Sequence, residues 1–407
     1  MMRPLEEVRS QVLRSMRRLG TETVPFGESM DRVLAEDVIA SHDVPHFANS
    51  AMDGFAVRAT DVSEPGAVLE VLEDVPAGQV ASAAVGEGQA IRIMTGAPMP
   101  AGADTVVRVE DTSAEADRVT VLEAVAEGTS VRAAGGDVHA GQLVFKPGER
   151  MTAVHIGVLA TLGVVKPVVS RRPRVGVMST GDELVPPDTS DLATGMIRDS
   201  NRPMLAALVE DAGAEVIDYG RIADDADELR AALGRAAIET DAIVTSGGVS
   251  MGDYDVTKLV LQDQAGVDFI KIAMKPGKPF AFGDLGGSPF FGLPGNPVSV
   301  LVSFEQFVRP ALLTMQGAMA VLRPQVAVIA GERFETDPLK TVFLRIAMVD
   351  DGAVVRAIQT GGQSSNVLSA AAAADAFAVV PRGVDVVDEG EPVLIELFRN
   401  RETRVSQ

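Results

Sequence analysis

Apolar runs that alternate with helical patterns between residues 173 and 318 predict an α/β domain. Runs typical of buried strands occur at 174–178, 215–219 and 241–245, and stretches of helical spacing include 204–212 and 227–238. Strands that alternate with helices across short loops are typical of a doubly wound, mostly parallel sheet. We therefore expect this sheet to form the central domain.

The chain on either side of this domain has a different pattern. Residues 45–140 contain short β-branched runs broken by Gly, Pro and Asp, which predict an inserted β-rich domain. Residues 1–44 and 141–172 predict an N-terminal helical and linker domain, which opens with a helix over 5–19. Strand-like runs recur over 319–407 and predict a small β-barrel or sandwich. The expected fold class is a multidomain combination of α/β and β.

Polar, glycine-rich turns follow the predicted strands of the α/β domain. The run Ser179-Thr180-Gly181 follows the first strand, and the run Ser246-Gly247-Gly248, with Ser250 beyond it, follows the third. Backbone N–H groups and hydroxyls at the start of a helix bind anions such as phosphate. A tight turn without a ligand is the alternative, and these residues alone do not separate the two.

Three lysines favour the ligand interpretation. Lys271, Lys275 and Lys278 surround a Pro-Gly turn that cannot be helical. Cationic groups on a stiffened loop suit an anionic ligand, because they supply charge at a fixed place.

A second rigid turn runs from Pro294 to Pro297 and leads into a helix predicted over 298–308, with Asn296 or Ser299 as its cap. Three successive strand ends therefore direct polar turns the same way. Ligands bind at that end of an open α/β sheet.

The net charge limits the possible partners. The chain of 407 residues has a formal charge of −21 and no cysteine. Nucleic acids and anionic membranes are bound mainly through Lys and Arg, so we expect neither as a partner. The absence of cysteine excludes disulfides and thiolate zinc sites. No signal region or membrane-spanning run is evident, and we expect a cytoplasmic protein.

Motifs of the common nucleotide folds are missing. There is no Gly-x-Gly-x-x-Gly after a strand and no Gly-x-x-x-x-Gly-Lys-Ser/Thr, and the four histidines are scattered. The histidines therefore do not favour a metal site or a Ser-His-Asp triad. Carboxylates at the strand ends are the oxygen ligands that Mg²⁺ takes beside phosphate. Most of them are expected to cap helices or face solvent, and Glu183 and Asp255 are the two metal candidates.

Seven motifs occur in a specific order along the chain. They are Asn49-Ser-Ala-Met-Asp-Gly54, Ile93-Met-Thr-Gly-Ala-Pro-Met-Pro100, Ser179-Thr-Gly-Asp-Glu-Leu184, Asp199-Ser-Asn-Arg-Pro203, Ser246-Gly-Gly-Val-Ser250, Lys275-Pro-Gly-Lys-Pro279 and Pro294-Gly-Asn-Pro-Val-Ser299. In this order they closely resemble the molybdopterin molybdenumtransferase (MoeA) family, the bacterial relatives of the gephyrin E domain. The resemblance covers essentially the whole chain. It implies four domains and a homodimer, with the active site in a cleft between the α/β domain of one subunit and the inserted domain of the other.

The resemblance also implies a reaction and the residues that perform it. Adenylylated molybdopterin and molybdate are consumed, the phosphate linkage is cleaved, and molybdenum cofactor and AMP are formed with help from Mg²⁺. The implied catalytic residues are Asp53, Thr95, Glu183 and Asp255, of which Glu183 and Asp255 are also metal ligands. The resemblance implies that the substrate-binding residues include Arg132, Asp137, Asp224, Lys271, Lys275, Pro294 and Pro297. From the turns of the α/β domain we also expect Ser179, Thr180, Gly181, Asp199, Ser200, Ser246, Gly247, Gly248, Ser250 and Lys278 to bind the substrate. Expected protein partners are a molybdopterin adenylyltransferase and cofactor-accepting molybdoenzymes.

One position departs from the family pattern, and two other functions stay open. Gly136 stands where the family usually has glutamate, but Arg132 and Asp137 remain, so we expect activity. A molybdopterin adenylyltransferase has a related α/β domain with a similar Ser-Gly-Gly turn, although the inserted and C-terminal domains favour the insertion step. A non-catalytic molybdopterin-binding scaffold is the second alternative, because gephyrin-like proteins also cluster receptors.

Overall fold

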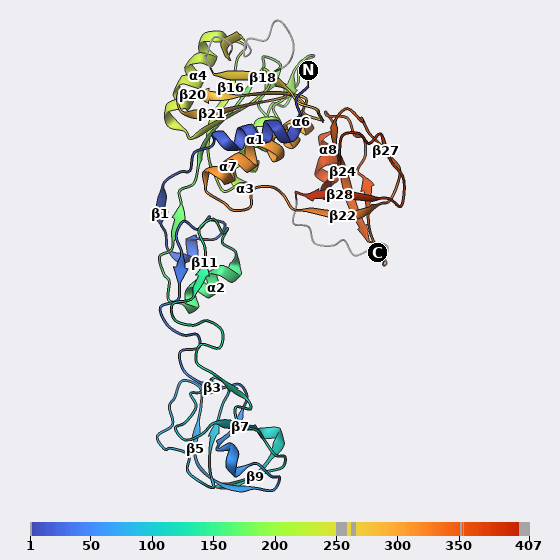
Figure 1. Ribbon diagram of the computed structural model, residues 1–407. Coiled ribbons are helices and arrows are strands. Elements are labelled where there is room, and N and C mark those ends of the chain that lie inside the picture. The colour runs from blue at the N-terminus through green and yellow to red at the C-terminus, as the bar shows by residue number, and fades with distance from the viewer. Residues whose placement is uncertain (1, 250–258, 262–265, 351, 353, 399–407) are drawn as a thin grey trace.

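The computed structural model describes residues 2–249, 259–261, 266–350, 352 and 354–398. Figure 1 shows an elongated molecule in which an α/β region and a C-terminal β region lie beside each other. A narrow stalk leads from the α/β region to a separate β-rich domain at the far end. The predicted fold class, a multidomain combination of α/β and β, is confirmed.

The α/β region is built on a six-stranded sheet. Its strands, in spatial order, are β16 (Glu215–Ile222), β13 (Arg174–Thr180), β17 (Ala242–Ser246), β21 (Ser288–Leu293), β20 (Pro279–Leu285) and β18 (Val267–Lys271). The first four are parallel, and β20 and β18 add an antiparallel edge. Every residue of β17 is buried, as expected of a parallel strand that is covered on both faces. The predicted doubly wound, mostly parallel sheet is therefore correct.

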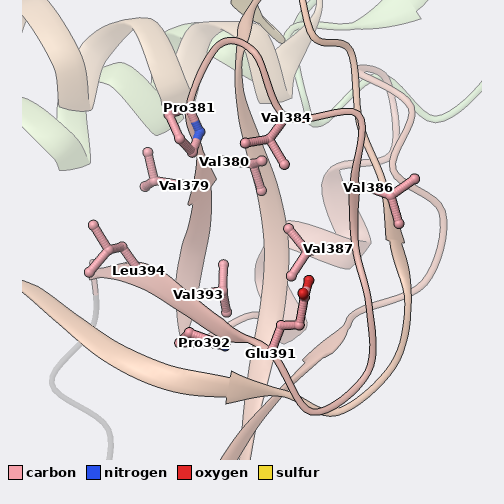
Figure 2. A pocket seen from close by; sticks show the side chains of 10 residues that line it. All are labelled: Val379, Val380, Pro381, Val384, Val386, Val387, Glu391, Pro392, Val393 and Leu394. Carbon is pink, nitrogen blue, oxygen red and sulfur yellow. The ribbon is translucent and has the colours of Figure 1, made fainter.

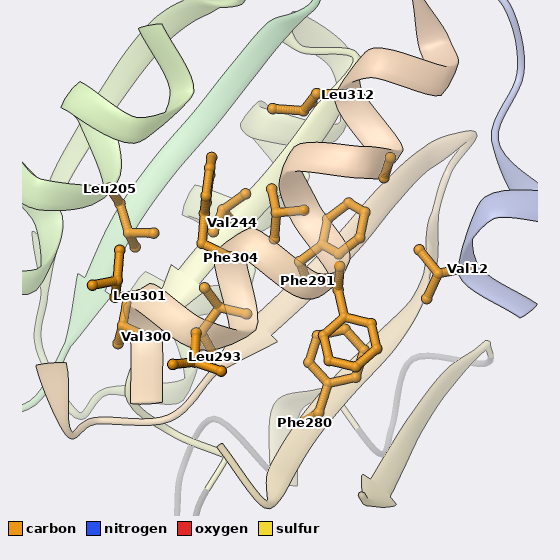
Figure 3. Close-up of a cluster of buried hydrophobic side chains, with 14 of the residues drawn as sticks. Val12, Leu205, Val244, Phe280, Phe291, Leu293, Val300, Leu301, Phe304 and Leu312 are labelled. Carbon is orange, nitrogen blue, oxygen red and sulfur yellow. The ribbon is translucent and has the colours of Figure 1, made fainter. Parts of the chain in front are cut away.

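Helices pack against this sheet. They are α3 (Asn201–Asp211), α4 (Ala226–Glu239), α6 (Pro297–Ser303), α7 (Arg309–Met315) and the N-terminal α1 (Leu5–Ser15). A π-helical segment, Phe304–Val308, joins α6 to α7. Figure 3 shows Phe280 and Phe291 of the sheet, Phe304 and Leu312 of the helices and Val12 of α1 as members of one buried cluster. Burial of each such side chain contributes about 1.5–3 kcal/mol, so this cluster stabilises the region that carries the strand ends.

The stretch Pro297–Met315 is long and apolar enough to cross a membrane, but 94% of its most apolar window is buried inside the protein. Its apolar side chains pack against the sheet of the α/β region. It is therefore a core helix in this structure.

The stalk consists of two short antiparallel strand pairs. β1 (Thr21–Thr23) pairs with β12 (Val168–Ser170), and β2 (Val38–Ile39) pairs with β11 (Leu143–Phe145). The helix α2 (Ala153–Thr161) contributes Leu159 to a small apolar core here. Because both directions of the chain pass through the stalk, the β-rich domain beyond it is an insertion.

The inserted domain holds a six-stranded sheet. The spatial order is β7 (Thr105–Arg108), β4 (Gly54–Val57), β6 (Gln89–Ile93), β5 (Val68–Val75), β9 (Arg118–Val121) and β8 (Thr112–Glu115). A separate pair, β3 (Asn49–Ser50) with β10 (Val131–Arg132), connects this domain to the stalk.

The C-terminal region is a closed five-stranded barrel. The order is β24 (Thr341–Asp350), β25 (Val355–Gln359), β22 (Gln325–Ala330), β28 (Pro392–Leu397) and β26 (Ala376–Val380), and β26 pairs back onto β24. β23 (Phe334–Glu335) pairs with β27 (Val386–Val387), and α8 (Leu368–Ala373) packs nearby. β19 (Met274–Lys275) pairs with β24. The loop that carries Lys271, Lys275 and Lys278, here called the lysine loop, is therefore joined directly to the barrel.

Two predicted element boundaries near the strand ends are wrong. The strand predicted over 174–178 continues through Ser179 and Thr180, because both residues pair with β16 and Ser179 also pairs with β17. The helix predicted over 204–212 begins at Asn201.

Two predicted helices also differ in extent. The helix predicted over 5–19 ends at Ser15, where Met16 turns to an extended backbone conformation. The helix predicted over 298–308 continues as one stretch to Met315. Asn296 precedes its first residue without a side-chain cap hydrogen bond, and Ser299 is buried inside it. The domain limits at 44/45, 140/141, 172/173 and 318/319 stay a prediction.

Candidate functional site

Most of the predicted site residues of the α/β region gather at one end of its sheet. The carboxyl ends of β13, β17, β21 and β16 lie at the same end because these strands are parallel. β18 also ends there, since Lys271 pairs with Pro279, the first residue of β20. The residues brought to this end are Thr180, Gly181, Glu183, Asp224, Ser246, Gly247, Gly248, Lys271, Lys278, Pro294 and Pro297.

The turn after β17 requires glycine. Gly247 has φ +93°, and a Cβ atom there would lie 2.7 Å from the carbonyl oxygen of Thr180. Its N–H donates to the carbonyl of Leu293 at 3.1 Å. The turn is thereby held between the ends of β13 and β21, where a side chain would force the strands apart.

Ser179 and Asp199 form a buried pair beneath the strand ends. The Ser179 hydroxyl donates to Oδ2 of Asp199 at 2.7 Å, and the Arg202 N–H donates to Oδ1 at 3.1 Å. Asp199 is 3% exposed and Ser179 is fully buried. These two residues therefore anchor the start of α3 to β13, while Ser200, which precedes α3, is exposed.

Asn201, the first residue of α3, links two of the turns and was not among the predicted site residues. Its side-chain nitrogen Nδ2 donates to Oγ of Ser246 at 2.8 Å and to the carbonyl of Gly295 at 2.7 Å. The signal available was its position inside the Asp199–Pro203 motif.

The acidic turns after β13 and β16 are joined by two reciprocal hydrogen bonds. The Asp224 N–H donates to the Asp182 carboxylate at 3.2 Å, and the Asp182 N–H donates to the Asp224 carboxylate at 3.4 Å. Arg221 donates to the carbonyl of Gly181 at 3.2 Å. Glu183 is exposed, and its carboxylate has no hydrogen-bond or ion-pair partner within the described ranges. Of these carboxylates, Glu183 is the one left for a ligand.

A cavity of about 600 Å³ opens between the lysine loop and the barrel. Lys275 and Lys278 line it from the α/β region, and neither bonds to a carboxylate in the part of the chain that the structure describes. The barrel side contributes Lys340, Gln363, Ser364 and Ser365. A cavity with three ammonium groups and several hydroxyl and amide groups suits an oxyanion.

Lys340 and Lys275 both affect the pKa of one neighbouring carboxylate, that of Asp337. The Lys340 ammonium donates to Asp337. This hydrogen bond, then one from the Leu339 N–H, and the charge of Lys275 lower the pKa of Asp337. Lys340 is therefore paired with Asp337, and Lys275 and Lys278 are the lysines of this cavity that have no carboxylate partner among the described residues.

A further cation lies behind the barrel side of this cavity. Arg345 is fully buried, and its Nη2 donates to the carbonyls of Gly362 and Ser364 at 2.7 and 3.2 Å. Its Nε and Nη1 have no acceptor among the described residues, and burial lowers its pKa. Neither Arg345 nor the barrel residues of the cavity were predicted from the sequence, because strand patterning alone does not show which loop a barrel residue faces.

The predicted residues of the inserted domain form a second group. Oδ1 of Asp53 accepts hydrogen bonds from the backbone N–H and the hydroxyl of Thr95. Arg132 lies exposed on β10, and Asp137 follows it in an exposed turn. Figure 1 places this domain at the opposite end of the molecule from the α/β sheet, so a single chain does not bring the two groups together.

Two predicted residues, Ser250 and Asp255, lie outside the described residues. Within the described ranges, no group of three or more His, Cys, Asp or Glu side chains is arranged to hold a metal ion. The described part of the chain therefore offers Glu183 alone of the two predicted metal ligands.

A second cavity, of about 380 Å³, lies at one end of the barrel (Figure 2). Its lining is mainly valine and proline, and its one carboxylate, Glu391, accepts a hydrogen bond from the N–H of Asp388. This lining offers no group that would react with or recognise an anion.

Comparison with protein families covers most of the chain. Residues 3–163 match the MoeA N-terminal region (domain I and II), 176–314 match a probable molybdopterin binding domain, and 327–398 match the MoeA C-terminal region (domain IV).

Similar proteins and structures agree with these matches. The chain is 39% identical over 399 residues to molybdopterin molybdenumtransferase 2 of Mycobacterium tuberculosis, which covers 96% of this chain and 98% of that protein. It is 37% identical to the Haemophilus influenzae molybdopterin molybdenumtransferase over 97% of this chain and 98% of that protein. The crystal structure of the MoeA protein from Pyrococcus horikoshii OT3 superposes with a TM-score of 0.86 at 32% identity, covering 98% of this chain and 100% of that one. These findings confirm the resemblance found in the motifs, and the chain belongs to the MoeA family of transferases in molybdenum cofactor biosynthesis.

Proposed function

We propose that this chain inserts molybdenum from molybdate into adenylylated molybdopterin and releases AMP. The observation that carries the proposal is the position of the lysine cavity directly beside the glycine-rich strand ends. Both Lys278 and Lys271 flank the start of β20, next to the turn that follows β21. A substrate with a phosphate linkage and a second, inorganic oxyanion need two such anion sites side by side.

The strand ends suit the phosphate linkage. Gly247 and Gly248 carry no side chain, so the backbone of this turn is open to a ligand. Their φ values of +93° and +67° are ones that glycine adopts readily. Ser246 and Asn201 add polar groups next to it. Because phosphate oxygens carry charge but no hydrogen, N–H and O–H donors at this turn favour them over neutral ligands.

The cavity suits molybdate. Lys275, Lys278 and Lys340 line it, and buried Arg345 adds charge from behind. Each charge-assisted hydrogen bond to an anion is worth about 1.5–3 kcal/mol, so two or three of them are enough to hold a dianion against competing water.

Mg²⁺ fits the exposed carboxylate at the strand ends. Mg²⁺ usually binds through one or two carboxylates plus substrate phosphate oxygens, and Glu183 has no competing described partner. We propose Glu183, with Asp255, as its protein ligands. Mg²⁺ held there would neutralise charge on the phosphate linkage during cleavage.

The separation of the two groups of residues supports a homodimer. Asp53, Thr95, Arg132 and Asp137 lie at the far end of the chain from the lysine cavity. In a two-fold dimer, the inserted domain of one subunit reaches the α/β region of the other if the two chains lie antiparallel. We propose that the active site is completed in this way.

The expected neighbours in the pathway follow from the substrate and product. We propose that a molybdopterin adenylyltransferase supplies the adenylylated substrate and that molybdoenzymes accept the finished cofactor. We also propose that these steps take place in the cytoplasm, in keeping with the lack of cysteine in the sequence.

The proposal is tested with purified protein, adenylylated molybdopterin, Mg²⁺ and molybdate. AMP release is followed together with reconstitution of a cofactor-free molybdoenzyme. We expect molybdate-dependent AMP release that Lys275→Ala and Asp255→Ala lower strongly and that Lys166→Ala, in an exposed part of the stalk, leaves unchanged. Formation of adenylylated molybdopterin from ATP would instead identify an adenylyltransferase. Binding of the substrate without cleavage would identify a scaffold.

A further inference from the structure

The carboxamide of Asn201 has a defined orientation. Nδ2 lies 2.7 Å from the carbonyl oxygen of Gly295, which only accepts hydrogen bonds. The atom beside it must therefore be the NH₂ group and not the side-chain oxygen. The second hydrogen of the same NH₂ group points to Oγ of Ser246 at 2.8 Å, so the Ser246 hydroxyl accepts this bond.

Because the Ser246 hydroxyl accepts a hydrogen bond from Asn201, we can say which further hydrogen bonds it is able to make. A serine hydroxyl has one hydrogen and two lone pairs. One lone pair is taken by Asn201, and the hydrogen has no acceptor among the described residues. Ser246 is the last residue of β17, and Gly247 and Gly248 follow it at the carboxyl end of the sheet. Ser246 is only 2% exposed, so its hydroxyl is largely shielded from water. A ligand at this turn would supply the acceptor that its hydrogen lacks within the described ranges.

Asn201 leaves a second polar atom without a partner. Its Oδ1 is buried and accepts no hydrogen bond from a described residue. A buried, unpaired carbonyl costs about 1–3 kcal/mol. The two hydrogen bonds that the same amide donates compensate for this unpaired oxygen, because they tie the turn after β17 to the turn after β21.

We propose that Asn201 is a positioning residue that turns the hydroxyl of Ser246 into a hydrogen-bond donor for a phosphate oxygen of the substrate. This inference rests on the proposed function, since it concerns the same strand ends. Asn201 does not itself touch the phosphate in this scheme. It occupies the serine lone pair, and the serine then presents its hydrogen.

The test is a double-mutant cycle on Asn201→Ala and Ser246→Ala, read out by AMP binding in calorimetry and by kcat and KM of AMP release. We expect each single variant to weaken AMP binding about 10-fold, the loss of one charge-assisted hydrogen bond, and to raise KM more than it lowers kcat. The double variant should lose no more than either single variant, because both changes remove the same bond. Gln79→Ala, an exposed amide in the inserted domain, is the matched control and should bind AMP as the wild type does.

Two results would overturn the inference. One is wild-type AMP binding by Asn201→Ala, and the other is a double variant whose loss is the product of the two single losses. Thermal unfolding of each variant is measured alongside. If Asn201 had only a structural role, its substitution would lower Tm and kcat together, and the two single variants and the double variant would not share the same rise in KM. Failure of the wild type to release AMP would contradict the proposed function instead, and the AMP-binding cycle would still decide the role of Asn201.

Discussion

Oδ1 of Asp53 accepts two hydrogen bonds from Thr95, one from the backbone N–H at 2.7 Å and one from the hydroxyl at 2.8 Å. Together they hold the pKa of Asp53 below its usual range, and the backbone bond contributes most. Because the folded-state pKa is lowered, the stabilisation that these bonds give is present above the ordinary pKa of an aspartate. It is lost as the pH falls through the lowered value.

Thr95→Val should therefore raise the pKa of Asp53 part of the way back to its usual value. The substitution removes the hydroxyl bond but keeps the backbone bond. The acid side of the pH–rate profile should move to higher pH, and an NMR titration of the Asp53 carboxyl carbon should show the same direction. Thr112→Val is the control, since the Thr112 hydroxyl donates to the carbonyl of Val109 and not to a carboxylate. An unchanged Asp53 titration in Thr95→Val would contradict this account.

Gly247→Ala and Gly234→Ala should shift stability in opposite directions. An alanine at 247 would need a positive φ and would bring Cβ to 2.7 Å from the Thr180 carbonyl, so we expect a loss of about 1–3 kcal/mol. Gly234 lies inside α4 with open space around its Cβ position, and alanine there should stabilise by about 0.5–1 kcal/mol. Denaturant unfolding of both variants measures the difference. A neutral Gly247→Ala would show that the turn is free to relax.

Glu305 should be far more important for stability than an exposed carboxylate. It is buried and accepts hydrogen bonds from Nε and Nη2 of Arg323 at 2.9 and 3.1 Å. It also lies beside Arg309, whose pKa burial lowers to about 10. Glu305→Gln leaves both arginines without its charge, and we expect a loss of about 3–5 kcal/mol.

The exposed pair Arg333–Asp388 is the matched control for Glu305. Its side chains are 58% and 63% exposed at a distance of 3.0 Å, so Asp388→Asn should cost only about 0–1 kcal/mol. Both variants are compared by denaturant unfolding under the same conditions. Equal losses would mean that the buried cluster contributes no more than a surface pair.

The glycine turn after β17 could be predicted because its chemistry is local, although Ser179, Thr180 and Ser246, which were expected in turns, are the last residues of strands. Glycines at 247 and 248 followed a buried apolar run, and the alternation of strands with helices placed that turn at the carboxyl end of the sheet. The barrel residues of the lysine cavity, such as Lys340 and Ser364, could not be found in this way. Their contact with Lys275 depends on how the barrel closes and on the pairing of β19 with β24. Arg345 was missed for a related reason, because a buried arginine inside a strand pattern has no local signature of its neighbours.

Complementation between two inactive variants should show whether two subunits share each active site. Asp53→Asn damages the inserted domain, and Lys275→Ala damages the cavity of the α/β region. If each site combines the inserted domain of one subunit with the cavity of the other, a mixed dimer contains one doubly damaged site and one intact site. Random pairing makes half of the dimers mixed, so co-expression should restore about one quarter of wild-type activity. Each variant expressed alone is the control. If one chain supplied both groups, every site would carry one lesion, and AMP release by the mixture would stay at the level of the separate variants.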